Sequence, residues 1–337
     1  MLSHERDELK IYKKIYYYDL LDHIIYRFKN IKTIGTGSFS NVVKAQDYKH
    51  NAYNAIKIIN STMLQKMDEP LNEINILKKL KNKEQHHITK LVEYFFFRKN
   101  LYMVFNLYDI TLHDYIYNSN LNSNSNSNLN SNLNLNYIKQ MVNAILFLNK
   151  NNIIHGDIKP NNIVFKDNTY QKLILIDFGN SITTETTNSN SNSNSNSNSN
   201  LQTISYRAPE IYFNQLFTTK HHFNYKIDIW SVGCVLYEMT LKKRLFENTT
   251  NIDLFINHNI IFDPPNTNYL LKLKELHQYY DCIDSPSFIK YKNTIYSFKR
   301  HKFIQKHKDH SKIIDLILHC CEWDIKDRFT CEQILDF

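Results

Sequence analysis

The sequence predicts a bilobal α+β protein, in which a small, mainly antiparallel β lobe precedes a larger α-helical lobe. Apolar and polar residues alternate through most of residues 29–107, and a period of two is that of β-strands. From Tyr137 onward, apolar residues instead recur at helical spacing. With 337 residues, 42% of them hydrophobic, the chain is long enough to bury a substantial core.

The β lobe, residues 29–107, is expected to contain five strands and one helix. The helix begins near Pro70, because proline is compatible with the first turn of a helix. Its apolar side is formed by Leu71, Ile74, Ile76, Leu77 and Leu80. The strands are expected in the stretches KNIKTIG, SNVVKAQDY, AYNAIKII, KLVEYFFF and LYMVFNLY. Residues 1–28 look helical, and we expect them to form an N-terminal extension.

The helical lobe, residues 108–337, is expected to carry two disordered inserts, at residues 118–136 and 188–200. Both consist of Asn and Ser with at most a few Leu, so they bury too little surface to offset the entropy cost of ordering. Outside the inserts, the clearest helical patterns are YIKQMVNAILFLNK and DIWSVGCVLYEMT.

Charge, hydropathy and cysteine spacing exclude several classes of protein. The net charge is +8, but both signs are spread along the chain and no Lys/Arg block resembles a nucleic-acid-binding arm. No apolar run approaches the roughly 18 residues of a membrane helix, and the five cysteines lack zinc or disulfide spacing. We therefore expect a monomer that binds neither nucleic acid nor membranes, in the cytoplasm or alternatively the nucleus.

Two glycines, Gly35 and Gly37, lie in a turn between two predicted strands. The helix that a dinucleotide-binding fingerprint requires does not follow them. Because glycine has no Cβ, the backbone N–H groups of such a hairpin can approach phosphates closely. From these residues alone, an ordinary hairpin turn remains the alternative.

A lysine on an otherwise apolar strand points to the same face as this hairpin. Ile56 and Ile58 flank Lys57 and point to the opposite face of the predicted sheet. A buried ammonium is costly unless it is paired, and Glu73 on the predicted helix can supply the carboxylate. Taken separately, each of the two could be a surface charge.

The stretch IIHGDIKPNNIVF reads as two short strands joined by a polar loop that carries Asp157, Lys159 and Asn162. A second motif, LILIDFGNS, places Asp177 directly after an apolar run, and Gly179 permits a sharp turn there. The Asp177 carboxylate and the Asn162 amide are oxygen ligands that suit Mg²⁺, which takes few protein ligands in addition to substrate phosphates.

Together these motifs resemble those of protein kinases. HGDIKPNN resembles their catalytic loop, DFG their metal-binding motif and AIK the motif of their strand lysine. YRAPE resembles the end of the activation segment, DIWSVGC the helix that anchors the helical lobe, and Arg328 the arginine that pairs with the Glu of APE. Order and spacing agree from about Arg27 to the C-terminus. The resemblance implies the bilobal protein kinase fold.

Further features are similar to SR-protein kinases and their LAMMER and dual-specificity relatives in the CMGC group. They are the stretches SFS, LNEI, MVFNL, DFGNS and LQTISYRAPE, and a small residue between His155 and Asp157. Lys159, two residues after the aspartate, follows the serine/threonine pattern. The resemblance implies an ATP- and Mg²⁺-dependent kinase that phosphorylates Ser or Thr in proteins, with Ser/Arg-rich proteins as candidate substrates. Ile204, where relatives often carry Arg, leaves the substrate preference open.

The resemblance also implies the roles of the catalytic residues. Lys57, oriented by Glu73, holds the α- and β-phosphates. Asp157 orients the substrate hydroxyl and accepts its proton, while Lys159 steadies the γ-phosphate. The residues implied in binding magnesium are Asn162 and Asp177. The residues implied in binding ATP, besides Lys57, are Ile34, Gly35, Thr36, Gly37, Ser38, Phe39, Val42, Ala55, Phe105 (as gatekeeper), Asn106 and Tyr108.

Two other functions remain as alternatives. A nucleotide-binding pseudokinase scaffold usually lacks the lysine or one of the two aspartates, and here all three are present. A small-molecule kinase shares the two aspartates but lacks YRAPE and the DIWSVG helix.

Gly156 is the one glycine of the five outside these expected motif positions. Many protein kinases carry at this position an arginine that binds a phosphate on the activation segment. We therefore expect a kinase that does not need activation-segment phosphorylation. The alternative is a neutral glycine at a solvent-facing position.

Overall fold

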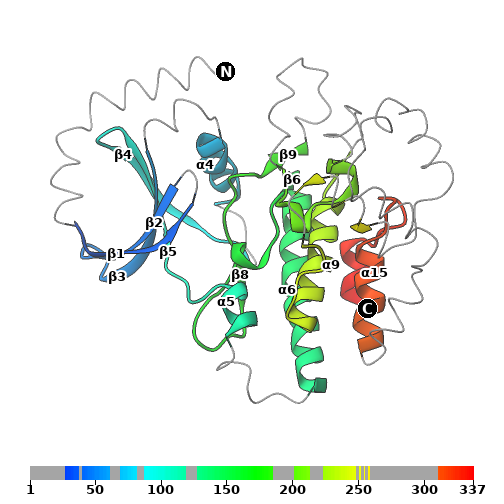
Figure 1. Cartoon of the computed structure of the whole chain (residues 1–337). Coiled ribbons are helices and arrows are strands. Elements are labelled where there is room, and N and C mark those ends of the chain that lie inside the picture. Colours follow the sequence, from blue (N-terminus) through cyan, green and yellow to red (C-terminus); the bar gives the residue numbers. More distant parts are fainter. Residues whose placement is uncertain are drawn as a thin grey trace, which may run out of the picture.

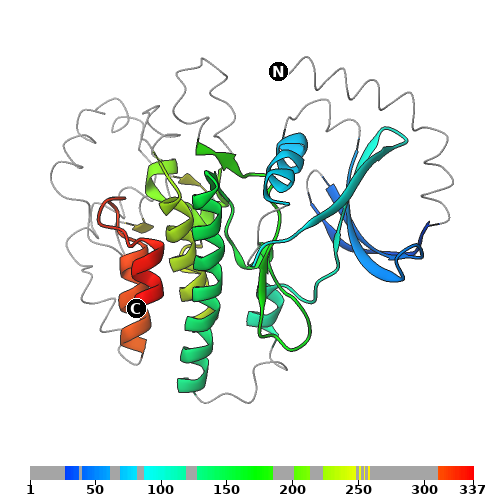
Figure 2. The same ribbon diagram turned by 180° about the vertical axis from the view of Figure 1, so that it is seen from behind.

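The computed structural model of the chain describes residues 27–37, 40–60, 69–81, 87–118, 127–184, 201–212, 223–247, 250, 251, 254, 257, 258 and 310–337. Figures 1 and 2 show a curled β-sheet at one side of the molecule and long helices side by side at the other. The bilobal α+β architecture expected from the sequence is therefore confirmed.

The sheet is antiparallel throughout and has the order β1-β2-β3-β5-β4. Its strands are β1 (Phe28–Thr36), β2 (Ser40–Asp47), β3 (Ala52–Ile59), β4 (Leu91–Phe97) and β5 (Asn100–Asn106). All five expected strands are present. Strand β1 begins at Phe28, which was expected to be the last residue of the N-terminal extension. Residues 1–26, for which a helix was expected, lie outside the described residues.

The sheet curls so that its two edge strands meet. The rings of Phe28 on β1 and Phe95 on β4 stack with their centroids 6.4 Å apart, although three strands separate β1 and β4. Arg27 ties the same corner by binding the carboxylates of Asp47 at 2.7 Å and Glu93 at 2.6 Å. The curl encloses a small apolar cluster that comprises Phe28, Val43, Ala45, Ile56 and Val104.

Helix α4 (Glu69–Leu80) lies between the sheet and the helical lobe (Figures 1 and 2). Ile74, Leu77 and Leu80 are almost completely buried, as the apolar pattern predicts. The same helix carries Glu73, which is only 2% exposed. Packing of the apolar side of α4 thus places the Glu73 carboxylate beside strand β3.

The helical lobe is built around α9 (Lys226–Leu241), against which α6 (Ser127–Lys150) and α15 (Ser311–Cys320) pack. Nearly every residue of α9 is buried, which is typical of a helix at the centre of a lobe. The shorter elements are α5 (Leu112–Tyr117), β6 (Ile153–Ile154), a 3₁₀ turn (Pro160–Asn162), β7 (Ile163–Phe165), β8 (Leu173–Leu175), β9 (Ile182–Thr183), a second 3₁₀ turn (Ile204–Tyr206) and α16 (Cys331–Asp336).

The boundary predicted for the first Asn/Ser insert was wrong, because α6 already begins at Ser127 and residues 127–136 are helical. Leu133 and Leu135 pack against the core of the lobe. Their burial, and propagation from the helix that follows, outweigh the poor helix propensity of asparagine. Residues 119–126 and the second insert, residues 188–200, lie outside the described residues.

Within the described ranges, no helix is long and apolar enough to cross a bilayer. The four cysteines of these ranges, Cys234, Cys320, Cys321 and Cys331, are buried free thiols. Among these residues, no group of three or more His, Cys, Asp or Glu side chains could hold a metal ion. The cysteines here therefore contribute to packing.

Candidate active site

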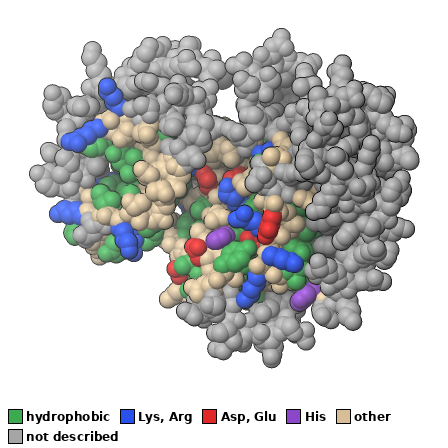
Figure 3. All heavy atoms as spheres, viewed as in Figure 1, with side chains coloured by type: hydrophobic (Ala, Val, Ile, Leu, Met, Phe, Trp, Pro, Cys, Tyr) green, Lys and Arg blue, Asp and Glu red, His purple; other side chains and the backbone are tan. Residues whose placement is uncertain are grey.

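The candidate site lies where the two lobes meet. β3 and α4 contribute from the sheet side, and the loops after β6 and β8 contribute from the helical side. Figure 3 shows acidic and basic side chains gathered in the middle of this face, between the two parts of the molecule. Side chains that are distant in sequence thus form one charged cluster.

Lys57 joins the two sides of the site. Its Nζ lies 2.8 Å from Oε2 of Glu73 and 2.7 Å from Oδ1 of Asp177. Burial lowers the pKa of an ammonium, but the two carboxylates outweigh this and raise the pKa of Lys57 above its usual value. The pairing of Lys57 with Glu73, expected from the sequence, is therefore confirmed and extends to Asp177.

The two carboxylates respond differently to this environment. Burial raises the pKa of Glu73 above its usual value despite the nearby ammonium. Desolvation also disfavours the charged form of Asp177, but the charge and hydrogen bond of Lys57 hold the pKa of Asp177 below its usual value. The Asp177 side chain is 43% exposed, so an ionised oxygen remains accessible to a ligand.

His155 fixes the backbone of the catalytic loop. Its Nδ1 accepts the N–H of Asp157 at 3.2 Å, and its Nε2 lies 3.1 Å from the carbonyl oxygen of Ile176. This arrangement requires a proton on Nε2 and none on Nδ1, which is the neutral imidazole. Burial lowers the pKa of His155, consistent with that form. The ring thereby connects the loop after β6 to the end of β8.

The Asp157 carboxylate accepts four hydrogen bonds. Oδ2 accepts from Nζ of Lys159 at 2.7 Å and from Nδ2 of Asn162 at 3.0 Å. Oδ1 accepts from the backbone N–H of Thr203 at 3.1 Å and from its hydroxyl at 2.7 Å. Lys159 also lies 2.8 Å from that hydroxyl. An aliphatic hydroxyl thus lies against the carboxylate and beside an ammonium.

Asn162 and Asp177 are brought together by a backbone hydrogen bond, in which the N–H of Ile176 donates to the carbonyl of Asn162 at 2.9 Å. The Asn162 amide nitrogen donates to Asp157, which leaves its oxygen as the atom suited to a metal. Lys57 uses only Oδ1 of Asp177. One carboxylate and one amide oxygen form a hard donor set that fits Mg²⁺ with phosphate ligands.

Strand register places the nucleotide-facing candidates on one side of the sheet. Val42 is paired with Gly35 on one side and Lys57 on the other, and Ala55 is paired with Phe105. Residues directly opposite each other in antiparallel strands share a face. These five candidates therefore lie together on the side of the sheet that carries the Lys57 ammonium.

The glycine hairpin closes through a hydrogen bond from the N–H of Gly37 to the carbonyl of Ser40 at 2.8 Å. Ile34 is half exposed, at 49%, and Thr36 is exposed. Both lie in the part of the hairpin where contact with a ligand was expected. Ser38 and Phe39 lie outside the described residues.

The segment after β5 connects the two lobes. The N–H of Asp109 donates to the carbonyl of Phe165 on β7, which fixes this segment to the helical lobe. Asn106 is exposed and Tyr108 is half-buried. Asn54 donates to the carbonyl of Phe105 at 3.1 Å, so the start of the segment is also held from β3.

The turn at Asp177 differs from the expectation that Gly179 makes it possible. The residue in the left-handed region is Asp177 itself, with φ 64°, whereas a Cβ on Gly179 would make only ordinary contacts. An aspartate in this region stores backbone strain. The contacts of Asp177 with Lys57 offset that strain and aim the carboxylate into the site.

The segment before YRAPE is held by Gln202, which sequence reasoning missed. Its side-chain Nε2 donates to the carbonyl of Ile227 and the hydroxyl of Ser231, both on α9, and its Oε1 accepts the N–H of Ala208. Its backbone carbonyl accepts two hydrogen bonds from the Arg207 guanidinium. A single glutamine in LQTISYRAPE carries no periodic signal that would have revealed this role.

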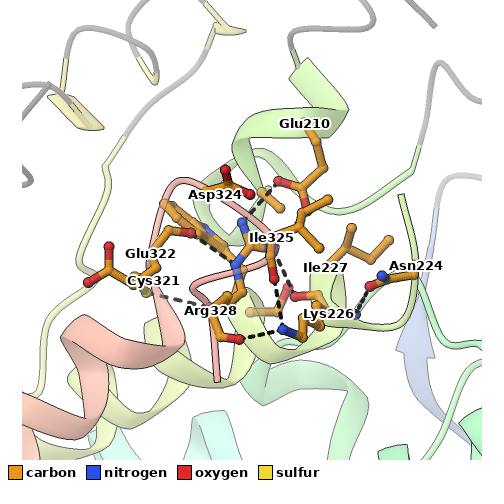
Figure 4. Close-up of polar contacts among 12 residues, drawn as sticks. Glu210, Asn224, Lys226, Ile227, Cys321, Glu322, Asp324, Ile325 and Arg328 are labelled. Carbon is orange, nitrogen blue, oxygen red and sulfur yellow. Dashed lines mark hydrogen bonds and ion pairs between the residues drawn. The ribbon is translucent and has the colours of Figure 1, made fainter. Parts of the chain in front are cut away.

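Arg328 anchors the other end of YRAPE, as the sequence predicts. Its guanidinium makes a bidentate pair with Glu210 at 2.7 and 3.0 Å, and Nε donates to the carbonyl of Glu322 (Figure 4). Lys226 donates from Nζ to the carbonyls of Ile325 and Arg328, at 2.8 and 2.6 Å. This network ties the segment to α9 and to the loop before α16.

Thr203 and Glu238 are further residues that sequence reasoning missed. Glu238, on α9, is fully buried and accepts the hydroxyl of Tyr206 at 2.6 Å and that of Tyr117 at 2.8 Å. Thr203 contacts Asp157 across 46 residues of sequence. Both lie within or beside motifs that were identified, but their contacts depend on tertiary structure alone.

Gly156 is buried and has φ 75°. The alternative of a neutral, solvent-facing glycine is therefore wrong. Its N–H donates to Oδ1 of Asp228 on α9 at 2.9 Å, while the neighbouring N–H of His155 donates to Oδ2 at 2.8 Å. The catalytic loop is thus attached directly to the central helix of the lobe.

Comparison with known proteins agrees with this geometry. The protein kinase domain model matches residues 28–337. A probable serine/threonine-protein kinase dyrk2 of Dictyostelium discoideum is 31% identical over 93% of this chain and 32% of its own length. The dual specificity tyrosine-phosphorylation-regulated kinase 2 of Drosophila melanogaster is 27% identical over 93% of this chain and 41% of its own length.

A third relative, serine/threonine-protein kinase ppk5 of Schizosaccharomyces pombe, is 29% identical over 93% of this chain and 36% of its own length. The chain thus spans about a third to two fifths of the length of each of these relatives. They support the dual-specificity part of the expected CMGC similarity rather than the SR-protein or LAMMER part. With the domain model matching from β1 to the C-terminus, the chain belongs to the protein kinase family.

Proposed function

We propose that the protein transfers the γ-phosphate of Mg²⁺-bound ATP to Ser and Thr hydroxyls of protein substrates. The observation that carries this proposal is the hydroxyl of Thr203, which donates to Oδ1 of Asp157 at 2.7 Å beside the Lys159 ammonium. A substrate hydroxyl placed on the same oxygen would be oriented for attack and could give up its proton there.

The chain's own residues supply the positioning that phosphoryl transfer requires. Lys57, held by Glu73, presents an ammonium to the phosphates on the face shared with Val42 and Ala55. Lys159, whose Nζ lies 2.8 Å from the Thr203 hydroxyl, would provide a second ammonium beside an acceptor hydroxyl. Magnesium, when bound, would neutralise phosphate charge, and Asp177 with Asn162 would hold it.

Serine and threonine, rather than tyrosine, are the proposed acceptors. Two of the relatives above are named serine/threonine-protein kinases, and another is named a dual-specificity kinase. The Thr203 hydroxyl lies 2.7 Å from Oδ1 of Asp157 and 2.8 Å from Nζ of Lys159, so an aliphatic hydroxyl can contact both groups at once. We therefore propose preference for Ser and Thr.

Activation-segment phosphorylation is not part of the proposed function. The Drosophila relative is named as regulated by tyrosine phosphorylation. Between Asn180 and Arg207, this chain has a single tyrosine, Tyr206. It is only 4% exposed and its hydroxyl is bonded to Glu238, so modification would require the segment to leave its place. Gly156 also offers no guanidinium for a phosphate.

We further propose that proteins rich in Ser and Arg are among the substrates. Asp109 and Asp114 are exposed and follow the segment that connects the lobes, and they would provide negative charge near the entrance of the site. Because exposed charges steer partners more than they bind them, the expected preference for arginine is modest.

The test is a peptide-array phosphorylation profile with labelled Mg²⁺-ATP, with the Asp157→Asn protein as control. The array contains matched peptides with Ser, Thr or Tyr acceptors, each with and without flanking arginine. We expect label on Ser and Thr peptides only, and none above background with Asp157→Asn. Label on Tyr peptides at a similar rate would refute the acceptor preference. Absence of wild-type label would favour the scaffold alternative.

A further inference from the structure

Gly156 lies where three parts of the chain meet. It is the one described glycine with positive φ, and its N–H and carbonyl are both engaged. The N–H binds Asp228 of α9, and the carbonyl accepts the N–H of Gln202 at 2.8 Å. The residue directly before Asp157 is therefore held by the central helix on one side and by the segment before YRAPE on the other.

The space at Gly156 is filled by the two described ends of the activation segment. A Cβ placed on Gly156 would lie 2.6 Å from Cδ1 of Leu201 and 2.8 Å from the carbonyl oxygen of Asn180. Real Cβ atoms do not approach other heavy atoms this closely. Leu201 is itself buried, at 4% exposure, so it has little room to move away. A backbone carbonyl is harder still to displace.

We propose that Gly156 is a positioning residue whose missing Cβ lets Asn180 and Leu201 close directly onto the catalytic loop and hold Asp157 in register with Thr203. Leu201 is two residues before Thr203, whose hydroxyl and N–H both bind Asp157. Displacement of Leu201 would therefore also move Thr203 relative to Oδ1 of Asp157, the oxygen proposed to bind the substrate hydroxyl. In this chain, direct packing fixes the segment in the way that a phosphate with an arginine fixes it elsewhere.

This inference depends on the proposed kinase function, and its test separates the two. The variants are Gly156→Ala, Leu201→Ala and the double variant, compared with wild type for peptide phosphorylation. Gly156→Ala is expected to lower kcat by at least about 10-fold, with the Kd of a non-hydrolysable ATP analogue unchanged. Leu201→Ala in the Gly156→Ala background is expected to recover part of kcat, because it removes the 2.6 Å contact.

Asn152→Ala is the matched control for backbone strain. Asn152 also has positive φ, 59°, but it is exposed in the turn between α6 and β6, and only its backbone carbonyl, which the substitution retains, contacts Thr184. A Cβ is already present there, so the substitution changes only the preference for the left-handed region. We expect a small fall in melting temperature and unchanged kcat.

Each outcome is decisive. An inactive wild type overturns the proposed function. The packing of Leu201 and Asn180 against Gly156 is then tested by the melting temperatures of wild type and Gly156→Ala. An active wild type with equal kcat in Gly156→Ala overturns the positioning role. If Gly156→Ala does not fold, a double variant that does fold supports the contact with Leu201, and a double variant that also fails to fold overturns the role. A loss of ATP-analogue binding together with kcat would indicate general disruption and overturn it too.

Discussion

Nζ of Lys57 lies 2.8 Å from Oε2 of Glu73, which joins β3 to α4 by an ion pair in which the carboxylate is only 2% exposed. A buried carboxylate without a partner is costly, so this pair stabilises the position of α4 against the sheet. The same ammonium reaches Asp177 on the other lobe. One side chain therefore determines how three elements of the site lie relative to one another.

Replacing Lys57 tests this arrangement first. Lys57→Met keeps an unbranched side chain of similar length but removes the ammonium from Glu73 and Asp177. We expect phosphoryl transfer to fall by orders of magnitude, because charge neutralisation at the phosphates is lost. Lys44→Met on the neighbouring strand, where the lysine lies over the Tyr53 ring, is the control and should retain activity. Full activity of Lys57→Met would contradict the role of the Lys57–Glu73 pair.

Asp157→Asn tests the proposed base. The amide preserves the shape of the side chain but cannot accept a proton, so we expect kcat to fall by about 10² to 10⁴-fold. The Kd of an ATP analogue should stay unchanged, since Asp157 is assigned to the acceptor side. Steady-state kinetics and isothermal titration measure the two quantities. Turnover equal to that of wild type would eliminate Asp157 as the base.

Thr203→Val tests the contact that sequence reasoning missed. Valine has nearly the same shape but no hydroxyl to donate to Asp157 or to meet Lys159. Loss of one such hydrogen bond to a charged group corresponds to about 10-fold in kcat. Thr203→Ser, which keeps the hydroxyl, is the control and should stay close to wild type. A loss in Thr203→Ser together with full activity of Thr203→Val would point to packing of the methyl group instead.

The pair between Glu210 and Arg328 is expected to matter for stability. Arg328 is 1% exposed, so Glu210→Ala would leave its guanidinium buried without its carboxylate partner. Breaking such a pair typically costs about 3–5 kcal/mol. Chemical denaturation should show this loss, whereas Asp315→Ala, at an exposed contact with His319, should change stability by less than about 1 kcal/mol. Similar small effects in both would contradict the anchoring role of Arg328.

Stability should also depend on pH through Asp228. Burial raises the pKa of Asp228 to about 7, although the N–H groups of His155 and Gly156 oppose this shift. The native state therefore keeps a proton that the unfolded chain loses near pH 4, and the stabilisation present below about pH 4 is lost as pH rises toward 7. The slope is at most about 1.4 kcal/mol per pH unit.

Asp228→Asn removes this titration. Denaturation midpoints measured between pH 4 and 8 should fall with pH for wild type more steeply than for Asp228→Asn. The comparison rests on the slopes, because the amide also alters the hydrogen bonds to the catalytic loop. Parallel slopes would show that Asp228 has an ordinary pKa.

Periodic features of the fold could be predicted from the sequence. Alternation along β3 placed Lys57 opposite Ile56, and the structure buries Ile56 in the curled sheet while Lys57 faces α4. The apolar side of α4 likewise predicted the burial of Ile74, Ile76, Leu77 and Leu80, whereas Leu71 is only partly buried. Such predictions succeed because one repeating pattern determines which side of an element is buried.

Contacts between distant loops could not be predicted in this way. Thr203 and Asp157 are far apart in sequence, and the positive φ of Gly156 depends on Leu201 and Asn180 packing beside it. The start of α6 was misplaced for a related reason, since burial of Leu133 and Leu135 outweighs a composition that disfavours helix. In each case tertiary packing decides, and a local pattern does not contain it.

We propose that this kinase domain is active without phosphate on its activation segment. The most direct measurement is the initial rate of peptide phosphorylation by protein co-expressed with a phosphatase and shown by mass spectrometry to carry no phosphate. We expect the same rate as for untreated protein, reached without a lag. A rate that is lost after phosphatase treatment, or that recovers only after a lag with Mg²⁺-ATP, would contradict it.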